Sequence, residues 1–245
     1  MIDSDVNFDI LKNKNVQEKI IDESSKIAKL NSFNGIVLDF ETSSLSFATV
    51  TNEITDFMTL YAQKVHAQNL KFAITLYGDT FYLSRPYDVA KLAKVTDEVF
   101  IMAYDFTKSR DNPGPNFPYG GTNIYGYDFQ TMIPDFEKNA PADKLTPVFG
   151  MFGYDWIVDS QGHSVGDGTS LALTDIQGKF INTCIAKNCS ESRDSASAEP
   201  EIKYIDSDNK NHVIWFEDNE SVGVKVKFLG ENGISSTAYW AYTYY

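Results

Sequence analysis

Basic residues are scarce in this chain of 245 amino acids, which holds 21 Lys and Arg against 34 Asp and Glu. The formal net charge at pH 7 is therefore −13. An acidic surface repels the phosphates of nucleic acids and of anionic lipid headgroups, so neither nucleic acid nor a membrane is an expected partner. Long apolar runs are also missing: no stretch approaches the roughly 20 residues of a membrane-spanning helix. Residues 1–5 are polar and acidic, which predicts no signal peptide in this chain.

Cysteine and histidine are also rare, with two Cys and three His. Cys184 and Cys189 stand in a C-x4-C pattern within a polar stretch that has no His nearby, which gives a zinc site little support. A local disulfide and two free thiols both remain open. No His is assigned a catalytic or metal-binding role, and we expect neither a metal nor another cofactor.

Apolar residues make up 42% of the chain, enough for the core of one large domain. Apolar runs alternate with amphipathic patterns along most of the sequence. The predicted helices cover residues 16–30, 53–69 (with Asn52 as N-cap), 86–95, 127–139 and 219–231. The predicted strands cover residues 35–41, 71–77, 99–104, 145–152 and 236–242. We interpret the alternation as an α/β fold, a parallel sheet with crossover helices.

The alternation stops after Trp156. Residues 157–218 are polar, with a hairpin predicted at 202–205 and 213–216 and a turn at 206–209. We interpret residues 157–218 as a small α+β insertion before the last strand, within a single domain that spans residues 1–245.

Two carboxylates end the first predicted strand. Residues 35–38 are apolar and predict a fully buried strand, and Asp39 and Glu41 follow it two positions apart. Residues i and i+2 of a strand point to the same face, so the two carboxylates are expected to project together. Buried charge is costly without a partner. The spacing alone fits a structural role, in helix capping or ion pairing, as well as it fits a functional site.

Polar or aromatic residues also end the later predicted strands. Tyr77 ends one strand, Tyr104 and Asp105 another, Tyr154 and Asp155 a third, and Trp240 the last. In a closed β/α barrel these strand ends form the active-site face, so residues far apart in the chain would converge there.

Five segments, in order along the chain, resemble motifs of glycoside hydrolase family 18. Residues 33–41 (FNGIVLDFE) resemble the D-G-x-D-x-D-x-E signature strand, and residues 102–105 (MAYD) resemble M-x-Y-D. Residues 150–156 (GMFGYDW) resemble G-x-x-x-Y-x-W. Residues 212–218 (HVIWFED) resemble the V-W-[FY]-E-D element of the branch that acts on bacterial cell wall and spore cortex. Residues 239–241 (YWA) resemble the segment with the eighth-strand Trp.

This resemblance implies a (β/α)8 TIM-type barrel and the hydrolysis of β-1,4 bonds next to N-acetylglucosamine, in peptidoglycan, spore cortex or chitin. In this family the acetamido oxygen of the substrate attacks the anomeric carbon, and the configuration is retained. Glu41 would be the general acid and base, Asp39 would orient the acetamido group, and Tyr104 would donate a hydrogen bond to its oxygen. The expected substrate-binding residues are Trp240, as a stacking platform, and Asp105, Tyr154 and Tyr77.

Two features depart from the family pattern. The first signature Asp is Asn34 and the middle one is Val37, which removes one means of tuning Asp39. In addition, the helix at 16–30 matches the one before the fourth strand of the family, so strands one to three have no counterpart among residues 1–15. A cropped sequence, a misplaced start, a partner chain that completes the barrel and a truly reduced barrel all remain open.

Two alternatives to an enzyme follow from the missing strands. One is a catalytically inactive, lectin-like glycan-binding protein, and the other is a coat or structural protein on the same fold. The intact Asp39-Phe40-Glu41 segment favours the enzyme. The expected location is extracellular, or associated with the cell wall or spore.

Overall fold

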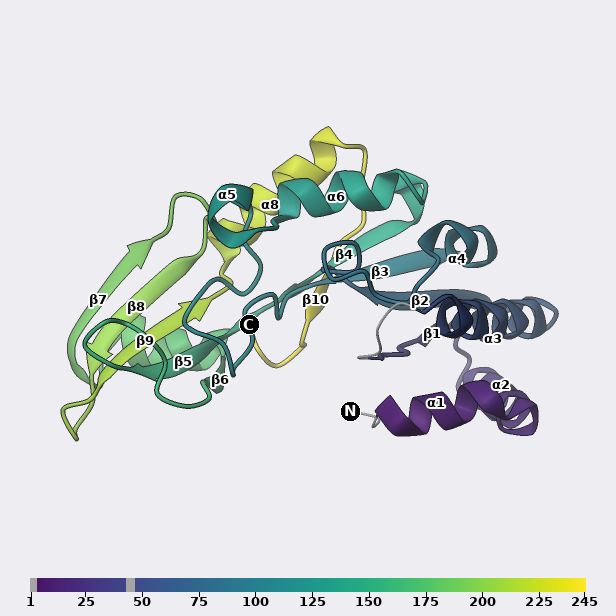
Figure 1. Ribbon diagram of the computed structural model, residues 1–245, viewed down its shortest axis with the longest axis horizontal. Helices are drawn as coiled ribbons and strands as arrows, with labels where there is room; N and C mark the ends of the chain where they lie inside the picture. The colour runs from purple at the N-terminus through teal and green to yellow at the C-terminus, as the bar shows by residue number, and fades with distance from the viewer. Residues whose placement is uncertain (1–3, 43–46) are drawn as a thin grey trace. The chain divides into compact units, whose positions relative to one another are not determined.

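The computed structural model describes residues 4–42 and 47–245 (Figure 1). The start of the chain, for which no signal peptide is predicted, lies partly outside the described residues. The helices are α1 (Ser4–Lys12), α2 (Lys14–Leu30), α3 (Ala48–His66), α4 (Val89–Val95), α5 (Thr122–Tyr125), α6 (Phe129–Glu137), α7 (Leu173–Ile176) and α8 (Asn219–Glu231). A 3-10 turn, η1 (Ala142–Lys144), and a π-helical turn, η2 (Gln177–Ile181), complete the helical segments. The strands are β1 (Gly35–Leu38), β2 (Lys71–Tyr77), β3 (Glu98–Ala103), β4 (Leu145–Gly150), β5 (Phe152–Val158), β6 (Thr169–Ala172), β7 (Lys187–Arg193), β8 (Pro200–Ile205), β9 (Asn211–Phe216) and β10 (Ala238–Trp240).

The strands form two five-stranded sheets. The first has the order β1-β2-β3-β4-β10, and β1 with β2 and β4 with β10 are parallel pairs. The second has the order β6-β5-β9-β8-β7 and is antiparallel. The prediction of an α/β fold with a parallel sheet is thereby confirmed, and so is the predicted hairpin, which β8 and β9 form.

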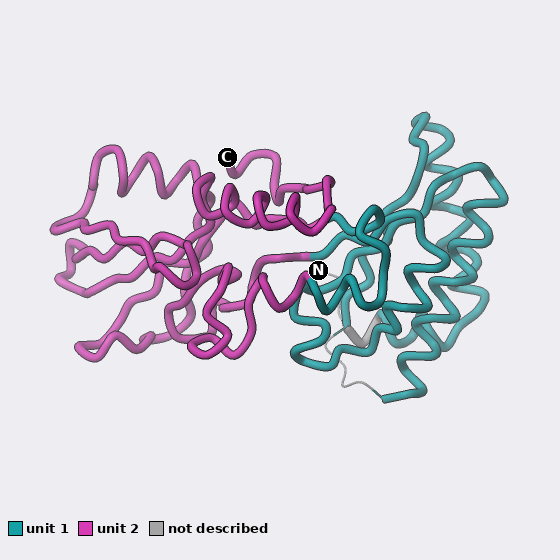
Figure 2. The backbone as a smooth tube through the Cα atoms, turned by 90° about the horizontal axis from the view of Figure 1, so that it is seen from above, with its two compact units in different colours: residues 1–101, 134–146 teal, residues 102–133, 147–245 magenta. Residues whose placement is uncertain are grey.

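The chain divides into two compact units, which Figure 2 shows in different colours. Unit 1 consists of residues 1–101 and 134–146, and unit 2 consists of residues 102–133 and 147–245.

The core of unit 1 is built on the apolar stripe of α3. Phe57 and Tyr61 are buried on this helix, and the Tyr61 ring stacks on Phe72 of β2 at a centroid distance of 4.8 Å. Phe57 packs edge-on against Tyr61 on one side and Phe40 on the other, at 5.9 and 5.7 Å. The ring series therefore extends to Phe40, the residue between the two carboxylates.

Helix α3 begins five residues earlier than the sequence predicts. Its N-cap is Phe47, and Asn52, the predicted cap, is an exposed residue within the helix. The Thr51 hydroxyl donates to the Phe47 carbonyl at 3.2 Å and the Thr55 hydroxyl donates to the Thr51 carbonyl at 2.7 Å. The two threonine hydroxyls hydrogen-bond to carbonyls four residues earlier in the chain. The helix therefore continues through position 52, where the sequence predicts its N-cap.

Strand β1 is not the buried strand that its apolar sequence predicts. None of its four residues is fully buried, and Val37 is 53% exposed. The strand also ends at Leu38, and the chain from Asp39 to Glu41 is irregular. The physical reason is its place in the sheet: β1 is a terminal strand whose one neighbour in the sheet order is β2. Burial on both faces requires neighbours that a terminal strand lacks.

The structure decides the state of the two cysteines and confirms the predicted turn at 206–209. Cys184 and Cys189 form a disulfide, with their Cα atoms 5.9 Å apart. The segment at 206–209 is a turn, because the Asp206 carboxylate accepts hydrogen bonds from the backbone N–H groups of Asp208 and Lys210, at 2.9 and 2.8 Å. Within the described residues, no group of three or more His, Cys, Asp and Glu could hold a metal ion, and no helix is long and apolar enough to cross a bilayer.

Unit 2 contains a fully buried cluster of three ionisable side chains. The Lys225 ammonium of α8 donates to Glu199 Oε1 at 3.0 Å and to Glu217 Oε2, and all three side chains have no exposed surface. The Ser221 hydroxyl donates to the other oxygen of Glu217 at 2.5 Å. Burial raises the pKa of Glu217 to about 8, although the Lys225 charge opposes the shift.

We expect the stability of the protein to fall as the pH rises from about 4.5 to about 8. The unfolded chain loses the Glu217 proton near the usual pKa of 4.5, whereas the folded chain keeps it up to about 8, so folding binds a proton in this window. Urea unfolding at several pH values measures the free energy of unfolding. Glu217→Gln should flatten this decline, while Glu231→Gln, at the exposed last position of α8, should not. An unchanged slope in Glu217→Gln would contradict the assignment.

Candidate active site

In unit 1, strand β2 presents two hydroxyl groups to the two carboxylates that follow β1. The Thr75 hydroxyl donates to Asp39 Oδ1, and the Tyr77 hydroxyl donates to Glu41 Oε2 at 2.7 Å. The register explains this match, because the parallel pairing sets Leu38 beside Ile74. Asp39, one residue after Leu38, then lies beside Thr75, one residue after Ile74. Glu41 lies beside Tyr77 in the same way, three residues further along each chain segment. Both pairs lie on the same side because residues i and i+2 share a face.

The Tyr77 hydroxyl keeps its proton in this environment. Burial raises its pKa above the usual range, and the hydrogen bond and charge of Glu41 raise it further. A protonated phenol donates its hydrogen bond, so the Glu41 carboxylate is the acceptor.

The backbone around the carboxylates is held by side chains from elsewhere in unit 1. Asn7 of α1, itself buried, donates through Nδ2 to the Glu41 carbonyl at 2.5 Å. The Tyr87 hydroxyl donates to the Phe40 carbonyl at 2.9 Å. With the Phe40 side chain buried between them, Asp39 and Glu41 are anchored although the chain there has no regular structure.

Asn7, Thr75 and Tyr87 were not predicted as site residues from the sequence. Thr75 could have been found, because the i, i+2 spacing that pairs Asp39 with Glu41 also pairs Thr75 with Tyr77. Asn7 and Tyr87 are brought to the carboxylates by helix packing and by a loop, and no periodicity in the sequence signals either contact.

In unit 2, Asp105 and Tyr154 are in direct contact. The Tyr154 hydroxyl donates to Asp105 Oδ1 at 2.8 Å. Burial raises the pKa of Tyr154 above its usual range, and the Asp105 charge adds to the shift. Asp105 has a left-handed backbone, with φ of 56°, and its N–H donates to Asn116 Oδ1 at 2.8 Å. Asn116 thereby stabilises a backbone conformation that non-glycine residues seldom adopt.

Tyr104 packs beside a glycine that leaves room for it. A Cβ atom on Gly150 would lie 2.6 Å from the Tyr104 Cβ, so no larger residue fits at position 150 without movement. The Tyr104 ring meets Phe152 edge-on at a centroid distance of 5.9 Å. Trp240, the last residue of β10, is 53% exposed, and its carbonyl accepts a hydrogen bond from the Met151 N–H at 2.8 Å.

The sequence predicts that Tyr154 and Asp155 follow a strand of the parallel sheet, and this prediction is wrong. They lie inside β5, a central strand of the antiparallel sheet, which starts only two residues after β4 ends. The apolar run from Leu145 to Phe152 conceals this change of sheet. Trp156 on the same strand is buried, and its indole N–H donates to the Ser109 carbonyl at 2.8 Å.

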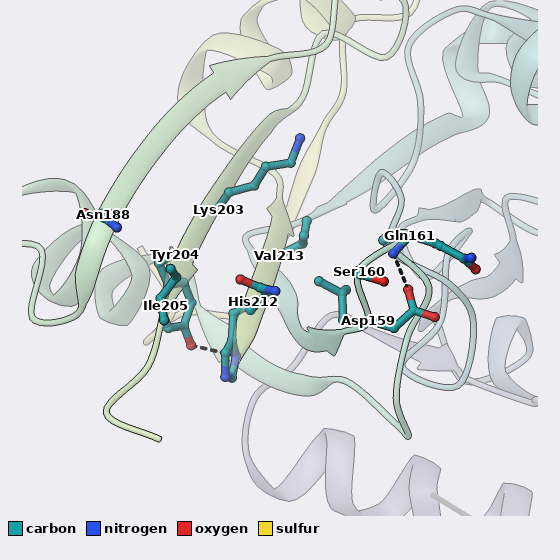
Figure 3. Close-up of a pocket in the computed structure, with 12 residues that line it drawn as sticks. Asp159, Ser160, Gln161, Asn188, Lys203, Tyr204, Ile205, His212 and Val213 are labelled. Carbon is teal, nitrogen blue, oxygen red and sulfur yellow. Dashed lines mark hydrogen bonds between the residues drawn. The ribbon is translucent and has the colours of Figure 1, made fainter. Parts of the chain in front are cut away.

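A separate pocket of about 450 Å³ lies on the antiparallel sheet of unit 2 (Figure 3). His212 and Tyr204 line it, and their rings stack at a centroid distance of 4.5 Å. His212 Nδ1 lies 3.0 Å from Asp155 Oδ1, and its Nε2 lies 3.3 Å from Asp206 Oδ2. None of the predicted catalytic or substrate-binding residues lines this pocket.

The structure thus brings together two subsets of the predicted residues. Asp39, Glu41 and Tyr77 lie together in unit 1, and Asp105 and Tyr154 are joined in unit 2.

Comparison with known proteins identifies the family. The model of glycosyl hydrolases family 18 matches residues 3–244. The cortical fragment-lytic enzyme of Bacillus subtilis is 23% identical over 237 residues, which are 94% of this chain and 51% of that protein. The class V chitinase of Arabidopsis thaliana is 24% identical over 241 residues, which are 93% of this chain and 62% of that protein. The matched part of this chain therefore spans about half to two-thirds of the length of these relatives.

Solved structures show the same fold. The crystal structure of a chitinase from Chromobacterium violaceum aligns with a TM-score of 0.78 and 22% identity, over 99% of this chain and 71% of that one. The resemblance inferred from the five motifs is confirmed by the match of the family model to almost the whole chain: this chain belongs to glycoside hydrolase family 18.

Proposed function

We propose that this chain is a glycosidase that cleaves β-1,4 bonds next to N-acetylglucosamine with retention of configuration. The observation that carries the proposal is the pair of carboxylates after β1, each held by a hydroxyl from β2. A positive charge develops on the substrate during this reaction. The general acid and the group that orients the substrate stabilise this charge best when both are held in fixed positions.

In the proposed reaction, Glu41 protonates the leaving glycosidic oxygen while the acetamido oxygen of the substrate attacks the anomeric carbon. Asp39 accepts the acetamido N–H and stabilises the cyclic cation that forms. Glu41, now ionised, then takes a proton from the water that opens this intermediate. No metal takes part in these steps.

The predicted substrate-binding residues keep their expected roles in this proposal. Tyr104 would donate a hydrogen bond to the acetamido oxygen, and the exposed indole of Trp240 would stack on a sugar ring. The hydrogen bond from Tyr154 fixes one oxygen of Asp105, and this supports a role for the pair as sugar ligands of defined orientation.

The Thr75 hydroxyl supports the proposed role of Asp39 although Val37 replaces the middle signature Asp. Val37 has no polar atom to offer, and its side chain is half exposed. The hydroxyl of Thr75 instead supplies a hydrogen bond to Asp39 from the neighbouring strand. We propose that this bond orients Asp39 in the absence of a second carboxyl group.

The relatives suggest the substrate and the location. One is named for lysis of cortical fragments and another is named a chitinase, so peptidoglycan and chitin are the two substrates to compare. These substrates support a site of action that is extracellular or associated with the cell wall or spore.

The exposed strand β1 favours an alternative. A terminal strand with a half-exposed valine beside the carboxylates is open to pairing with a further strand. On this alternative the chain binds glycan, or serves as a coat component, and does not catalyse hydrolysis by itself. Hydrolysis would then require a preceding segment or a partner chain that covers β1.

Glu41→Gln should lower the rate of hydrolysis by at least about 100-fold, because amide nitrogen cannot replace a proton-donating carboxyl group. Release of reducing ends from chitin oligosaccharides and from peptidoglycan measures the rate. Glu23→Gln, on the exposed side of α2, serves as the control and should leave it unchanged. Absence of turnover by the unmodified chain on both substrates would overturn the glycosidase proposal and favour the binding alternative.

Thr75→Val should lower kcat by about tenfold, the usual scale for a hydrogen bond to a charged group. Thr75→Ser keeps the hydroxyl and should retain most of the activity, which separates the hydrogen bond from side-chain volume. Equal kcat values for the valine and serine variants would show that the hydroxyl does not assist Asp39.

A further inference from the structure

The loop after β2 places a buried ion pair on the ring of Tyr77. Arg85 Nη2 donates to Asp79 Oδ2 at 2.7 Å, and Arg85 Nε donates to Asp79 Oδ1. The two side chains are only 11% and 10% exposed. The guanidinium carbon of Arg85 lies 3.7 Å from the centroid of the Tyr77 ring. The Asp79–Arg85 pair thus covers the phenol whose hydroxyl binds Glu41.

Backbone hydrogen bonds of the loop hold the two charged residues together. The Thr80 N–H donates to the Tyr77 carbonyl at 3.1 Å, and the Arg85 N–H donates to the Thr80 carbonyl at 2.9 Å. The chain therefore turns back directly after β2. This turn brings Asp79 and Arg85, six residues apart, to the same ring.

The geometry of the pair fixes the plane of the guanidinium group. Two parallel hydrogen bonds to one carboxylate leave a guanidinium little freedom to rotate. Burying such a pair costs desolvation energy, so it is poor evidence for a gain in stability. A planar cation held against an aromatic face does, however, restrain the ring that it covers.

Tyr87 restrains Tyr77 in a second way. The two ring centroids are 6.4 Å apart with an interplanar angle of 46°, and the Tyr87 hydroxyl is bound to the Phe40 carbonyl next to Glu41. The Tyr77 ring therefore contacts both the cation and a second ring, and its hydroxyl reaches Glu41.

We propose that Arg85 and Asp79 are positioning residues of the reaction. They hold the ring of Tyr77, and the Tyr77 hydroxyl holds the Glu41 carboxylate in a single orientation for proton transfer. Tyr77 then acts on the acid rather than on the sugar. This inference rests on the proposed role of Glu41 as the general acid.

Kinetics of Tyr77→Phe, Arg85→Met and the double variant test the proposal in the full chain. Tyr77→Phe removes only the hydroxyl and should lower kcat by about tenfold, with KM within about twofold, because one hydrogen bond to the acid is lost. Arg85→Met should also lower kcat, and the double variant should be no slower than Tyr77→Phe, because Arg85 acts through the Tyr77 hydroxyl. Lys91→Met, which breaks the exposed pair with Asp88, is the control.

Two kinetic outcomes would overturn the proposal. Multiplying losses in the double variant would mean that Arg85 acts independently of Tyr77. A higher KM with unchanged kcat in Tyr77→Phe would mean that Tyr77 binds the sugar. If Arg85→Met does not fold, Arg85→Lys replaces it, since lysine keeps the charge but lacks the planar fork.

A measurement that does not depend on turnover separates this proposal from the proposed function. With ¹³C at the phenolic carbon of tyrosine, the NMR signal of Tyr77 is the one that Tyr77→Phe removes. Glu41→Gln and Arg85→Met should each shift this signal, and Lys91→Met should not. If Glu41→Gln stops hydrolysis while Arg85→Met changes neither the signal nor kcat, the positioning proposal is wrong and the glycosidase proposal stands. If Glu41→Gln leaves hydrolysis unchanged, the proposed function fails and the positioning role fails with it.

Discussion

The parallel register of β1 and β2 is the constraint on which the arrangement of unit 1 depends. It sets Leu38 beside Ile74, and from this point the hydroxyls of Thr75 and Tyr77 meet the carboxylates of Asp39 and Glu41. Because side chains alternate between the faces of a strand, a slip of one residue would turn both hydroxyls to the opposite face. A single register thus determines two contacts at once, although the carboxylates themselves lie beyond the end of the strand.

Unit 2 depends on buried charge in a comparable way. Glu199 is paired with Lys225, and its two carboxylate oxygens also accept the backbone N–H groups of Asn116 and Phe117, at 2.6 and 2.8 Å. Asn116 in turn binds the N–H of Asp105. The Glu199 carboxylate is thus connected through Asn116 to the backbone of Asp105, the last residue of the M-x-Y-D motif. This connection accounts for a buried lysine and two buried glutamates better than stability does, since buried ion pairs contribute little net stability.

Regular elements with a clear period could be predicted from the sequence. The predictions for β2 and α8 agree with the structure to the residue, because residues 71–77 are a mostly apolar run that forms one strand and Asp218 caps α8 through a reciprocal hydrogen bond with Ser221. The change of sheet between β4 and β5 was not predictable. Gly150 and Gly153 permit it by close contacts with Tyr104 and the Trp215 carbonyl, and such contacts exist only in the folded chain.

The candidate site was predictable where motifs carry the signal, and not where loops do. The i, i+2 spacing of Asp39 and Glu41 was informative, and so was the position of Tyr77 at a strand end. The contact of Arg85 with Tyr77 was not, because it depends on a turn that reverses the chain between positions 79 and 85. Periodicity describes residues within an element and says nothing of side chains that a loop folds back onto that element.

The exposure of β1 explains why so many side chains converge on the two carboxylates. In a strand buried on both faces, packing alone would restrict the motion of the residues that follow it. Here Val37 is half exposed, and the restraint comes instead from hydrogen bonds: Asn7 on the Glu41 carbonyl, Tyr87 on the Phe40 carbonyl, and two hydroxyls on the carboxylates. Directional bonds fix orientation as well as position, which apolar packing does not. Unit 1 therefore orders its carboxylates from β2, α1 and the loop after β2, and this order does not require the burial of the strand that carries them.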